Sequence, residues 1–303
     1  MSTATTGLVP LAMKPAPFRY VAARSVEQAL ALKAEHGDEA RFLAGGQSLV
    51  PAMNFRLTQP AVLIDINPIK ELAGIRNGGD RLRIGALTRY RSLERDPMTQ
   101  VKLPLIAEAL PVIAHPQIRN RGTIGGNLAH ADPASEMPAI VLTLGGRLHA
   151  QSVRGERWIE AGDFFVGALT TALEPDELLT EVELPVAAAD SGACFLEMSR
   201  RRGDFAIIGV ACTLRLDAQG QCVEARIGLC NAGDGPVFAD EASRSLIGKH
   251  ISEREIAEAA ALVQNAIDPG GSIHASKEYQ RHIAGVLTAR ALATASERAR
   301  RGH

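Results

Sequence analysis

The chain has 303 residues, of which 46% are hydrophobic and 22% are charged, and its formal net charge is −1. This length allows two domains or three small ones, and the composition is that of an ordinary globular protein. The near-zero net charge and an aromatic content of 4% argue against nucleic acid as a partner, and the charge also argues against an acidic membrane surface.

The N-terminal segment 1–17 is rich in Thr, Ala and Pro and is expected to form a loose arm. It lacks the charged start and apolar core of a secretory signal, and no later stretch has the roughly 20 apolar residues that span a bilayer. The four cysteines form no C-x-x-C pair, which argues against a zinc or iron–sulfur site and favours buried, reduced thiols. We therefore expect a cytoplasmic protein, with peripheral association at the inner face of the membrane left open.

A small β-α-β unit is expected over 18–66. Its helix, 25–36, carries a capping box formed by Ser25 and Gln28, and Gly37 stands where the chain leaves the helix. The other elements expected here are a strand over 40–43, a short helix over 48–55 and a buried strand over 61–66.

A second subdomain is expected over 67–188. Its elements are strands over 81–85 and 178–184, helices over 88–95, 105–114 and 135–144, and a polar loop over 115–122. The pattern changes near Phe195, so a domain boundary is placed within 185–194. The C-terminal domain, 189–303, is expected to contain strands over 205–216 and 225–230 and helices over 252–267 and 276–300.

Two glycine-rich segments carry most of the functional information. Glycine loop 1 consists of Ala44, Gly45, Gly46, Gln47 and Ser48, and glycine loop 2 of Thr123, Ile124, Gly125, Gly126 and Asn127. A Gly-Gly pair lets the backbone approach a ligand closely, and backbone N–H groups in such turns bind pyrophosphate. One such loop is also typical of an ordinary tight turn, but two of them predict a dinucleotide held between two subdomains.

The motifs of other nucleotide-binding or hydrolytic sites are missing from the sequence. It contains no G-x-x-x-x-G-K-[ST], G-x-G-x-x-G, H-E-x-x-H or G-x-S-x-G segment. His115, His130 and His149 have no Cys or Ser at a spacing that suggests a nucleophile. We therefore assign no catalytic side chain and no metal ligand.

Four segments resemble the flavoprotein subunits of molybdenum hydroxylases. AGGQSLVPAMNFRL (44–57) and PQIRNRGTIGGNLAHADPASEMPA (116–139) are similar to the two FAD-binding segments of that family. RRRGDFAIIGVA (200–211) and HASKEYQRHIAGVLTARAL (274–292) resemble its C-terminal domain. The resemblance is to the medium subunits of carbon monoxide dehydrogenase and related bacterial enzymes, and to a module within xanthine dehydrogenases. It implies an α+β fold: a PCMH-type FAD-binding domain, with a small β-α-β unit and a larger mixed-sheet subdomain, followed by a C-terminal antiparallel sheet with helices.

The resemblance also implies roles for individual residues. Both glycine loops would enclose the pyrophosphate of non-covalent FAD, with the Thr123 hydroxyl and the Asn127 amide as donors. Glu136 would accept hydrogen bonds from the ribose hydroxyls, although a carboxylate is also typical of a helix start. Leu179 would lie near the adenine or the flavin edge. Phe205 would lie near the isoalloxazine, or else belong to the core.

Gln47 departs from the pattern of the family, and the role of the arginine clusters stays open. Many relatives have His where this chain has Gln47, and we expect this change to leave FAD binding intact and to alter the flavin potential or the access of the acceptor. The three arginines 200–202 are typical of a solvated face, with a partner subunit or the FAD phosphates as alternative contacts. The C-terminal arginines, Arg298 among them, are expected to be solvated.

The resemblance finally implies a function. The chain would be the FAD-binding electron-transfer subunit of a heterotrimer, beside a large molybdopterin-binding subunit and a small subunit with [2Fe-2S] clusters, in a dimer of heterotrimers. It would pass electrons to an external acceptor that the sequence does not identify, and the substrate is equally open. The alternatives are a stand-alone FAD oxidoreductase, a non-redox nucleotide-binding assembly subunit, and a complex that runs as a reductase.

Overall fold

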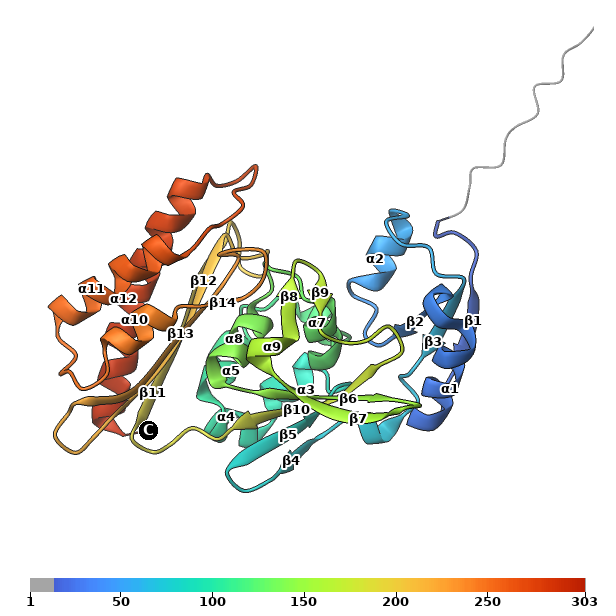
Figure 1. The fold of residues 1–303 in the computed structure, drawn as a ribbon, viewed down its shortest axis with the longest axis horizontal. Helices are drawn as coiled ribbons and strands as arrows, with labels where there is room; N and C mark the ends of the chain where they lie inside the picture. Colours follow the sequence, from blue (N-terminus) through green and yellow to red (C-terminus); the bar gives the residue numbers. More distant parts are fainter. Residues whose placement is uncertain (1–13, 303) are drawn as a thin grey trace, which may run out of the picture.

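Three sheets follow one another along the long axis of the molecule, in the order of the sequence (Figure 1). The computed structural model describes residues 14–302, so most of the expected N-terminal arm lies outside the described residues. We call the three the small sheet, the larger sheet and the C-terminal sheet. Helices accompany each of them, and the expected α+β class is confirmed.

The small sheet contains β1 (Arg19–Ala22), β2 (Ala40–Leu43) and β3 (Val62–Asp65), which pair in parallel in the order β1-β3-β2. Parallel strands need a crossover, and α1 (Val26–His36) supplies it between β1 and β2. The predicted cap is present, since Ser25 Oγ accepts a hydrogen bond from Gln28 N at 3.2 Å. The region is completed by α2 (Leu49–Asn54) and two short 3₁₀ helices, η1 (Gly37–Glu39) and η2 (Lys70–Leu72).

The larger sheet has five strands in the order β4-β5-β10-β6-β7. Their bounds are β4 (Ile75–Asn77), β5 (Arg81–Gly85), β6 (Arg147–Ser152), β7 (Gly155–Glu160) and β10 (Leu178–Pro185). All four pairings are antiparallel, whereas the small sheet is parallel. Parallel and antiparallel pairing are therefore segregated between two sheets rather than mixed within the larger one.

Short helices cover one face of the larger sheet (Figure 1). They are α3 (Tyr90–Arg95), α4 (Pro97–Lys102), α5 (Pro104–Ala109), α6 (Pro116–Arg119), α7 (Ile124–His130), α8 (Glu136–Leu144) and α9 (Ala161–Phe164), with a two-stranded ribbon, β8 (Phe165–Gly167) and β9 (Thr170–Thr171). The main apolar core fills the space between these helices and inward-facing strand residues such as Ile84 and Val182. The other face of the sheet is polar, and there Glu183 pairs with Arg81, Arg83 and Arg147.

The C-terminal sheet is antiparallel and has helices on both faces. Its strands are β11 (Ser191–Met198), β12 (Ile208–Leu216), β13 (Cys222–Cys230) and β14 (Val237–Phe238), and its helices are α10 (Asp240–Ser245), α11 (Glu253–Ala266) and α12 (Lys277–Arg301). α12 packs on β11 and β12, while α5 and α8 from the preceding region pack on β11, β12 and β13. The four cysteines are buried, unpaired thiols in this sheet, as predicted. None of the helices in 14–302 has both the length and the apolarity needed to cross a bilayer.

Several expected boundaries were wrong. The helix expected over 105–114 ends at Ala109, and Ala114 has a positive φ of 50°. The polar loop 115–122 contains α6, which begins at Pro116, a favourable first helical residue. The strand expected from Phe205 begins at Ile208, and β11, over Ser191–Met198, was not predicted. The hairpin of β6 and β7 was not predicted.

Two arginines, one on β13 and one on α12, join the C-terminal part of the chain to the helices of the preceding region. Arg226 on β13 donates to the Leu142 carbonyl at 3.1 Å and to the Thr143 carbonyl, at the C-terminus of α8. Arg298, which was expected to be solvated, instead pairs with Glu108 of α5 at 2.6 Å. Cations at helix C-termini are favourable, so Arg226 both satisfies carbonyls and complements the helix dipole.

Candidate cofactor site

The two glycine loops meet at the junction between the small and larger sheets. A Cβ added at Gly45 would overlap the carbonyl oxygen of Arg121 and lie 2.9 Å from Gly122 Cα. A Cβ at Gly126 would lie 3.6 Å from the Cβ of Ala44. Only glycine permits the first of these approaches, so Gly45 is required by the contact itself. The structure thus brings together two segments that lie about eighty residues apart in the sequence.

Glycine loop 1 leaves β2 with its backbone donors free. In the part of the chain that the structure describes, the N–H groups of Gly45, Gly46, Gln47 and Ser48 donate to no backbone carbonyl. Gly46 has a φ of 72°, a conformation that favours glycine. Gln47 is held by its own loop, because its side-chain amide donates to the Gly45 carbonyl at 3.0 Å. Several N–H groups on one short turn form a suitable cradle for an anion.

Glycine loop 2 uses part of its backbone for structure. Ile124 N donates to the Thr88 carbonyl at 3.1 Å and Gly125 N to the Ala86 carbonyl at 2.9 Å. Both residues are buried, and Ile124 is part of the main core. Thr123 caps α7, with its Oγ accepting from Gly126 N at 3.1 Å, which leaves its O–H free to donate. Gly126 is therefore the exposed residue of this loop, Thr123 is only 2% exposed, and Ile124 and Gly125 attach the loop to the segment that follows β5.

Asn127 has one polar group bound within the chain and one left unpaired. Its amide nitrogen donates one of its two N–H groups to Ser135 Oγ at 3.0 Å. Its Oδ1 is buried and has no hydrogen-bond partner among the described residues. A buried unpaired acceptor costs free energy unless a ligand satisfies it. Asn127 therefore offers a cofactor its Oδ1 as an acceptor, in addition to the second N–H of its amide group.

Glu136 starts α8 and is only 5% exposed. Burial raises the pKa of its carboxyl from 4.5 to about 8, and the charges of Glu197 and Asp132 act in the same direction. A carboxyl with this pKa is largely protonated at neutral pH, so it can donate one hydrogen bond and accept others. This extends the role implied by the resemblance, in which Glu136 would only accept.

Two other polar groups near Glu136 have unpaired atoms. Glu197 on β11 has a buried Oε2 without a partner in 14–302, and burial raises its pKa to about 7. The hydroxyl of Tyr90 is likewise buried and unpaired, and burial together with the charge of Glu136 raises its pKa well above 10. Unpaired polar atoms on three elements fit a ligand rich in hydrogen-bonding groups, as FAD is.

Leu179 and Phe205 have different surroundings. Leu179 is buried in the main core, so its side chain packs among apolar neighbours. Phe205 is 66% exposed on the segment between β11 and β12, which excludes the alternative that it is a core residue. An exposed ring is free to stack on a planar ligand. The three arginines 200–202 next to it are also exposed.

Sequence reasoning missed Asn67 and Arg89. Asn67 follows β3 at the carboxyl edge of the small parallel sheet, the edge at which ligands bind in open parallel sheets, and this position was the available signal. Arg89 was hidden inside a segment interpreted as helix. They line a cavity of about 400 Å³ together with Lys70 and Thr88. A larger cavity of about 500 Å³, on the polar face of the larger sheet, includes no residue of either glycine loop.

Comparisons with known proteins place this site in context. Residues 16–187 match the family described as the FAD binding domain in molybdopterin dehydrogenase, and residues 193–295 match the CO dehydrogenase flavoprotein C-terminal domain. The chain is 45% identical to the 6-hydroxypseudooxynicotine dehydrogenase complex subunit alpha of Paenarthrobacter nicotinovorans, over 95% of this chain and 97% of the relative. It is 39% identical to the caffeine dehydrogenase subunit beta of a Pseudomonas species, over 94% and 97%. A chain of carbon monoxide dehydrogenase from Hydrogenophaga pseudoflava superposes with a TM-score of 0.92 at 38% identity, over 94% of this chain and 99% of that one.

Proposed function

This chain belongs to the family of FAD-binding medium subunits of molybdenum hydroxylases, and we propose that it carries electrons from iron–sulfur clusters of a partner subunit to an external acceptor. It is the flavoprotein subunit of an oxidoreductase, and FAD is its cofactor. Bound FAD supplies the redox chemistry, since a flavin takes up electrons one at a time and releases two. The observation that carries the proposal is the contact between the two glycine loops, beside free backbone donors.

The residues of the chain bind and orient the cofactor. We propose that the N–H groups of glycine loop 1 hold the pyrophosphate and that Thr123 donates to it from glycine loop 2. Asn127 Oδ1 and the Glu136 carboxyl would bind hydroxyl groups of the cofactor. Phe205 would stack near the isoalloxazine, and Leu179 would support the site from the core. No side chain of the chain needs to exchange a proton with the organic substrate.

The remaining partners follow from the same proposal. The names of relatives include "complex subunit alpha" and "medium chain", which supports a large molybdopterin-binding subunit and a small [2Fe-2S] subunit. We further propose a dimer of such heterotrimers in the cytoplasm. The relatives named above act on a nicotine derivative, on caffeine and on carbon monoxide, which supports a substrate pocket outside this chain. The family matches support a division near 188, with an FAD-binding domain over 18–188 and a second domain over 189–303.

The first test concerns the cofactor and the electrons. The full chain is purified, its visible spectrum is recorded, and the chromophore released by heat is identified. We expect flavin bands at ~370 and ~450 nm, and FAD as the released chromophore. The chain is then mixed with chemically reduced small subunit, and bleaching of the ~450 nm band is followed in a stopped-flow instrument. Bleaching by the small subunit, but not by organic substrate alone, supports the electron-transfer role. A chain that binds FAD but is not reduced in this way would point to the stand-alone oxidoreductase, and a chain that takes up nucleotide but no flavin would point to the assembly subunit.

A further inference from the structure

Two polar side chains connect the two glycine loops through hydrogen bonds to backbone carbonyls and to each other. Asn67 Nδ2 donates to the carbonyl of Ala44 in glycine loop 1 at 2.8 Å. Asn67 Oδ1 accepts from Arg89 Nη2, and Arg89 Nη1 donates to the carbonyl of Arg121, just before glycine loop 2. We call Asn67 and Arg89 the loop clamp. It is the side-chain counterpart of the close backbone contact at Gly45.

Asn67 is held rigidly on the small sheet. Asp65, the last residue of β3, accepts from Asn67 N at 3.0 Å and from its amide group. The other oxygen of Asp65 accepts from the Tyr20 hydroxyl on β1. Because a trans peptide is planar, turning the Ala44 carbonyl toward Asn67 turns the N–H of Gly45 to the opposite side. Asn67 therefore sets the direction of a donor in glycine loop 1.

Arg89 lies in the larger sheet region and is attached to glycine loop 2 through its backbone. Its backbone forms an antiparallel bridge with Thr123, and Tyr90 N donates to the Gly122 carbonyl at 3.1 Å. Its side chain alone crosses to the small-sheet side, where it meets Asn67. A change at this side chain therefore alters the relation between the loops without removing any backbone pairing of either.

The charge of Arg89 is poorly compensated. Its guanidinium is partly buried, and no carboxylate in 14–302 lies within ion-pair distance of it. Burial and the neighbouring Arg121 lower its pKa, while Asp65 acts in the opposite direction from farther away. A partly desolvated cation is favourable beside an anion, because the attraction is strong where water is scarce. The two phosphates of a dinucleotide would supply that anion at the loops.

We propose that Arg89 is a positioning residue for the cofactor: with Asn67 it holds the two glycine loops at the separation that one pyrophosphate requires, and it adds positive charge behind them. The inference rests on the proposed FAD site. It predicts that the clamp acts on affinity for the dinucleotide more than on folding of the chain.

The test uses the full chain stripped of FAD, four single variants, and the double variant that combines Arg89→Met with Asn67→Ala. Arg89→Met removes charge and donors, Arg89→Lys keeps the charge but cannot bridge two acceptors in the same way, and Asn67→Ala removes the other half of the clamp. Arg244→Met, at an exposed arginine of α10, is the matched control for loss of one positive charge. The dissociation constant of FAD is measured by quenching of flavin fluorescence, at low and high salt, and thermal unfolding is recorded without FAD.

We expect Arg89→Met to weaken FAD binding roughly 30-fold or more, in line with loss of charge-assisted hydrogen bonds, and to reduce the dependence of binding on salt. Arg89→Lys should recover part of the affinity and most of the salt dependence. The double variant with Asn67→Ala should bind little worse than Arg89→Met, because the two residues act as a unit. Unfolding of the FAD-free chain should shift little in any variant.

The proposal is overturned if Arg89→Met binds FAD within about twofold of the unchanged chain, or no worse than Arg244→Met, since neither result leaves the loop clamp a role in FAD affinity. It is also overturned if the effects of Arg89→Met and Asn67→Ala are additive. If Arg89→Met does not fold, Arg89→Lys decides: intermediate affinity supports the clamp, and unchanged affinity rejects it. Failure of the unchanged chain to bind FAD would instead reject the proposed function.

Discussion

Glu136 is the residue at which the site and the stability of the protein are most directly linked. Its carboxyl has a pKa of about 8 in the folded chain and an ordinary value of 4.5 when unfolded. Between these values the folded state binds more protons than the unfolded one, so the free energy of unfolding falls as pH rises. The stabilisation is fully present below pH 4.5 and is lost as pH passes 8.

We therefore expect the FAD-free chain to lose stability over this range, with a contribution from Glu136 of up to ~1.4 kcal/mol per pH unit. Glu136→Gln should flatten the profile, because the amide does not titrate, and Glu197, whose pKa is raised to about 7, should account for part of the remaining slope. Urea unfolding at several pH values measures this. Glu253→Gln, at an exposed position of α11, is the control. A profile equally steep in Glu136→Gln and in the unchanged chain would contradict the assignment.

Gly45 offers a second residue-scale prediction. Alanine at this position would place its Cβ on the Arg121 carbonyl, so the glycine loops must separate to accommodate it. We expect Gly45→Ala to weaken FAD binding by about tenfold or more, since a small misplacement of binding groups is costly. Gly162→Ala is the matched control, because nothing lies within 4 Å of an added Cβ there. The FAD content of both purified variants distinguishes them, and equal content would show that the loops adapt.

These residues show how far sequence reasoning reaches. The glycine pairs were predictable because a tight backbone approach leaves few alternatives to glycine. The protonation of Glu136 was not, because it depends on burial of the carboxyl in the fold and on the charge of Glu197, which is about sixty residues away in the sequence. Asn67 and Arg89 were missed for the same reason: each is an ordinary polar residue until the fold places it between two loops.

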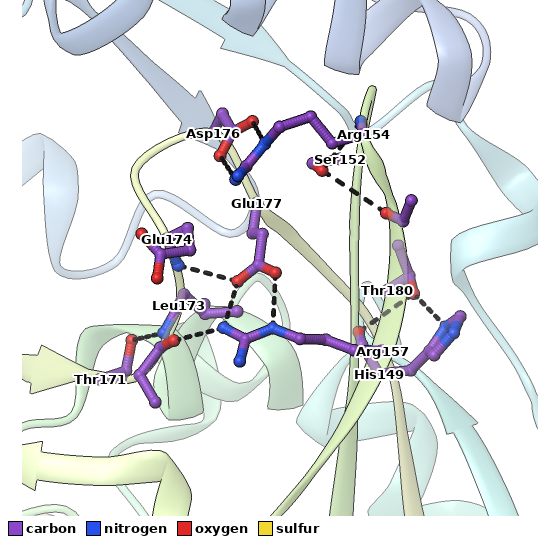
Figure 2. Close-up of polar contacts among 12 residues, drawn as sticks. His149, Ser152, Arg154, Arg157, Thr171, Leu173, Glu174, Asp176, Glu177 and Thr180 are labelled. Atoms are coloured by element: carbon purple, nitrogen blue, oxygen red, sulfur yellow. Dashed lines mark hydrogen bonds and ion pairs between the residues drawn. The ribbon is translucent and has the colours of Figure 1, made fainter.

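At the scale of elements, the hairpin of β6 and β7 fixes the start of β10. Figure 2 shows Arg154 and Arg157 on this hairpin reaching to Asp176 and Glu177, which directly precede β10. The first two residues of β10 then enter different cores, Leu178 that of the small sheet and Leu179 that of the larger one. The hairpin thus helps to set the angle between the two sheets that carry the glycine loops.

Arg154 and Arg157 should differ in their contribution to the stability of the chain. Arg157 makes two hydrogen bonds to Glu177, at 2.7 and 2.9 Å, and one to the Ala172 carbonyl, and Glu177 is only 8% exposed in its side chain. Arg154 makes a similar pair with Asp176, but there the two side chains are 65% and 28% exposed. Arg157→Met should cost about 1–2 kcal/mol, because it leaves a buried carboxylate without its cationic partner. Arg154→Met should cost under ~0.5 kcal/mol, as exposed pairs do.

Urea unfolding of the two variants, measured in parallel, tests this prediction. The dependence of the free energy of unfolding on urea concentration should be the same in both, so that the midpoints report stability. Equal losses of stability would mean that burial of the acidic partner does not decide how much the pair contributes.

The hairpin itself was not predicted from the sequence, because its polar face is charged on both strands and its turn lacks an Asn-Gly or Asp-Gly signal. Elements with an explicit cap, such as α1 and α11, were predicted closely.

At the scale of the whole molecule, α8 connects the cofactor site to the C-terminal domain. Its first residue is Glu136, and the carbonyls near its C-terminus accept hydrogen bonds from Arg226 of β13. Between these ends the helix packs on the main core and on β12 and β13, and Gly228 allows close approach, since a Cβ there would overlap Thr143 Oγ1. A change in the docking of the C-terminal sheet must therefore reach the helix that carries Glu136.

Arg226 is the side chain that tests this connection. Its guanidinium lies over the Phe238 ring, with Cζ 4.8 Å from the ring centre, and burial lowers its pKa. Arg226→Met would keep much of the apolar packing but leave the Thr143 carbonyl of α8 without its donor, a loss of about 2 kcal/mol. We expect the C-terminal domain to unfold in a separate, earlier step, with faster hydrogen exchange in α8 and weaker FAD binding. Arg244→Met, which keeps this contact, should retain a single transition, and an unchanged FAD affinity in Arg226→Met would show that α8 does not transmit the docking of the C-terminal sheet to the site.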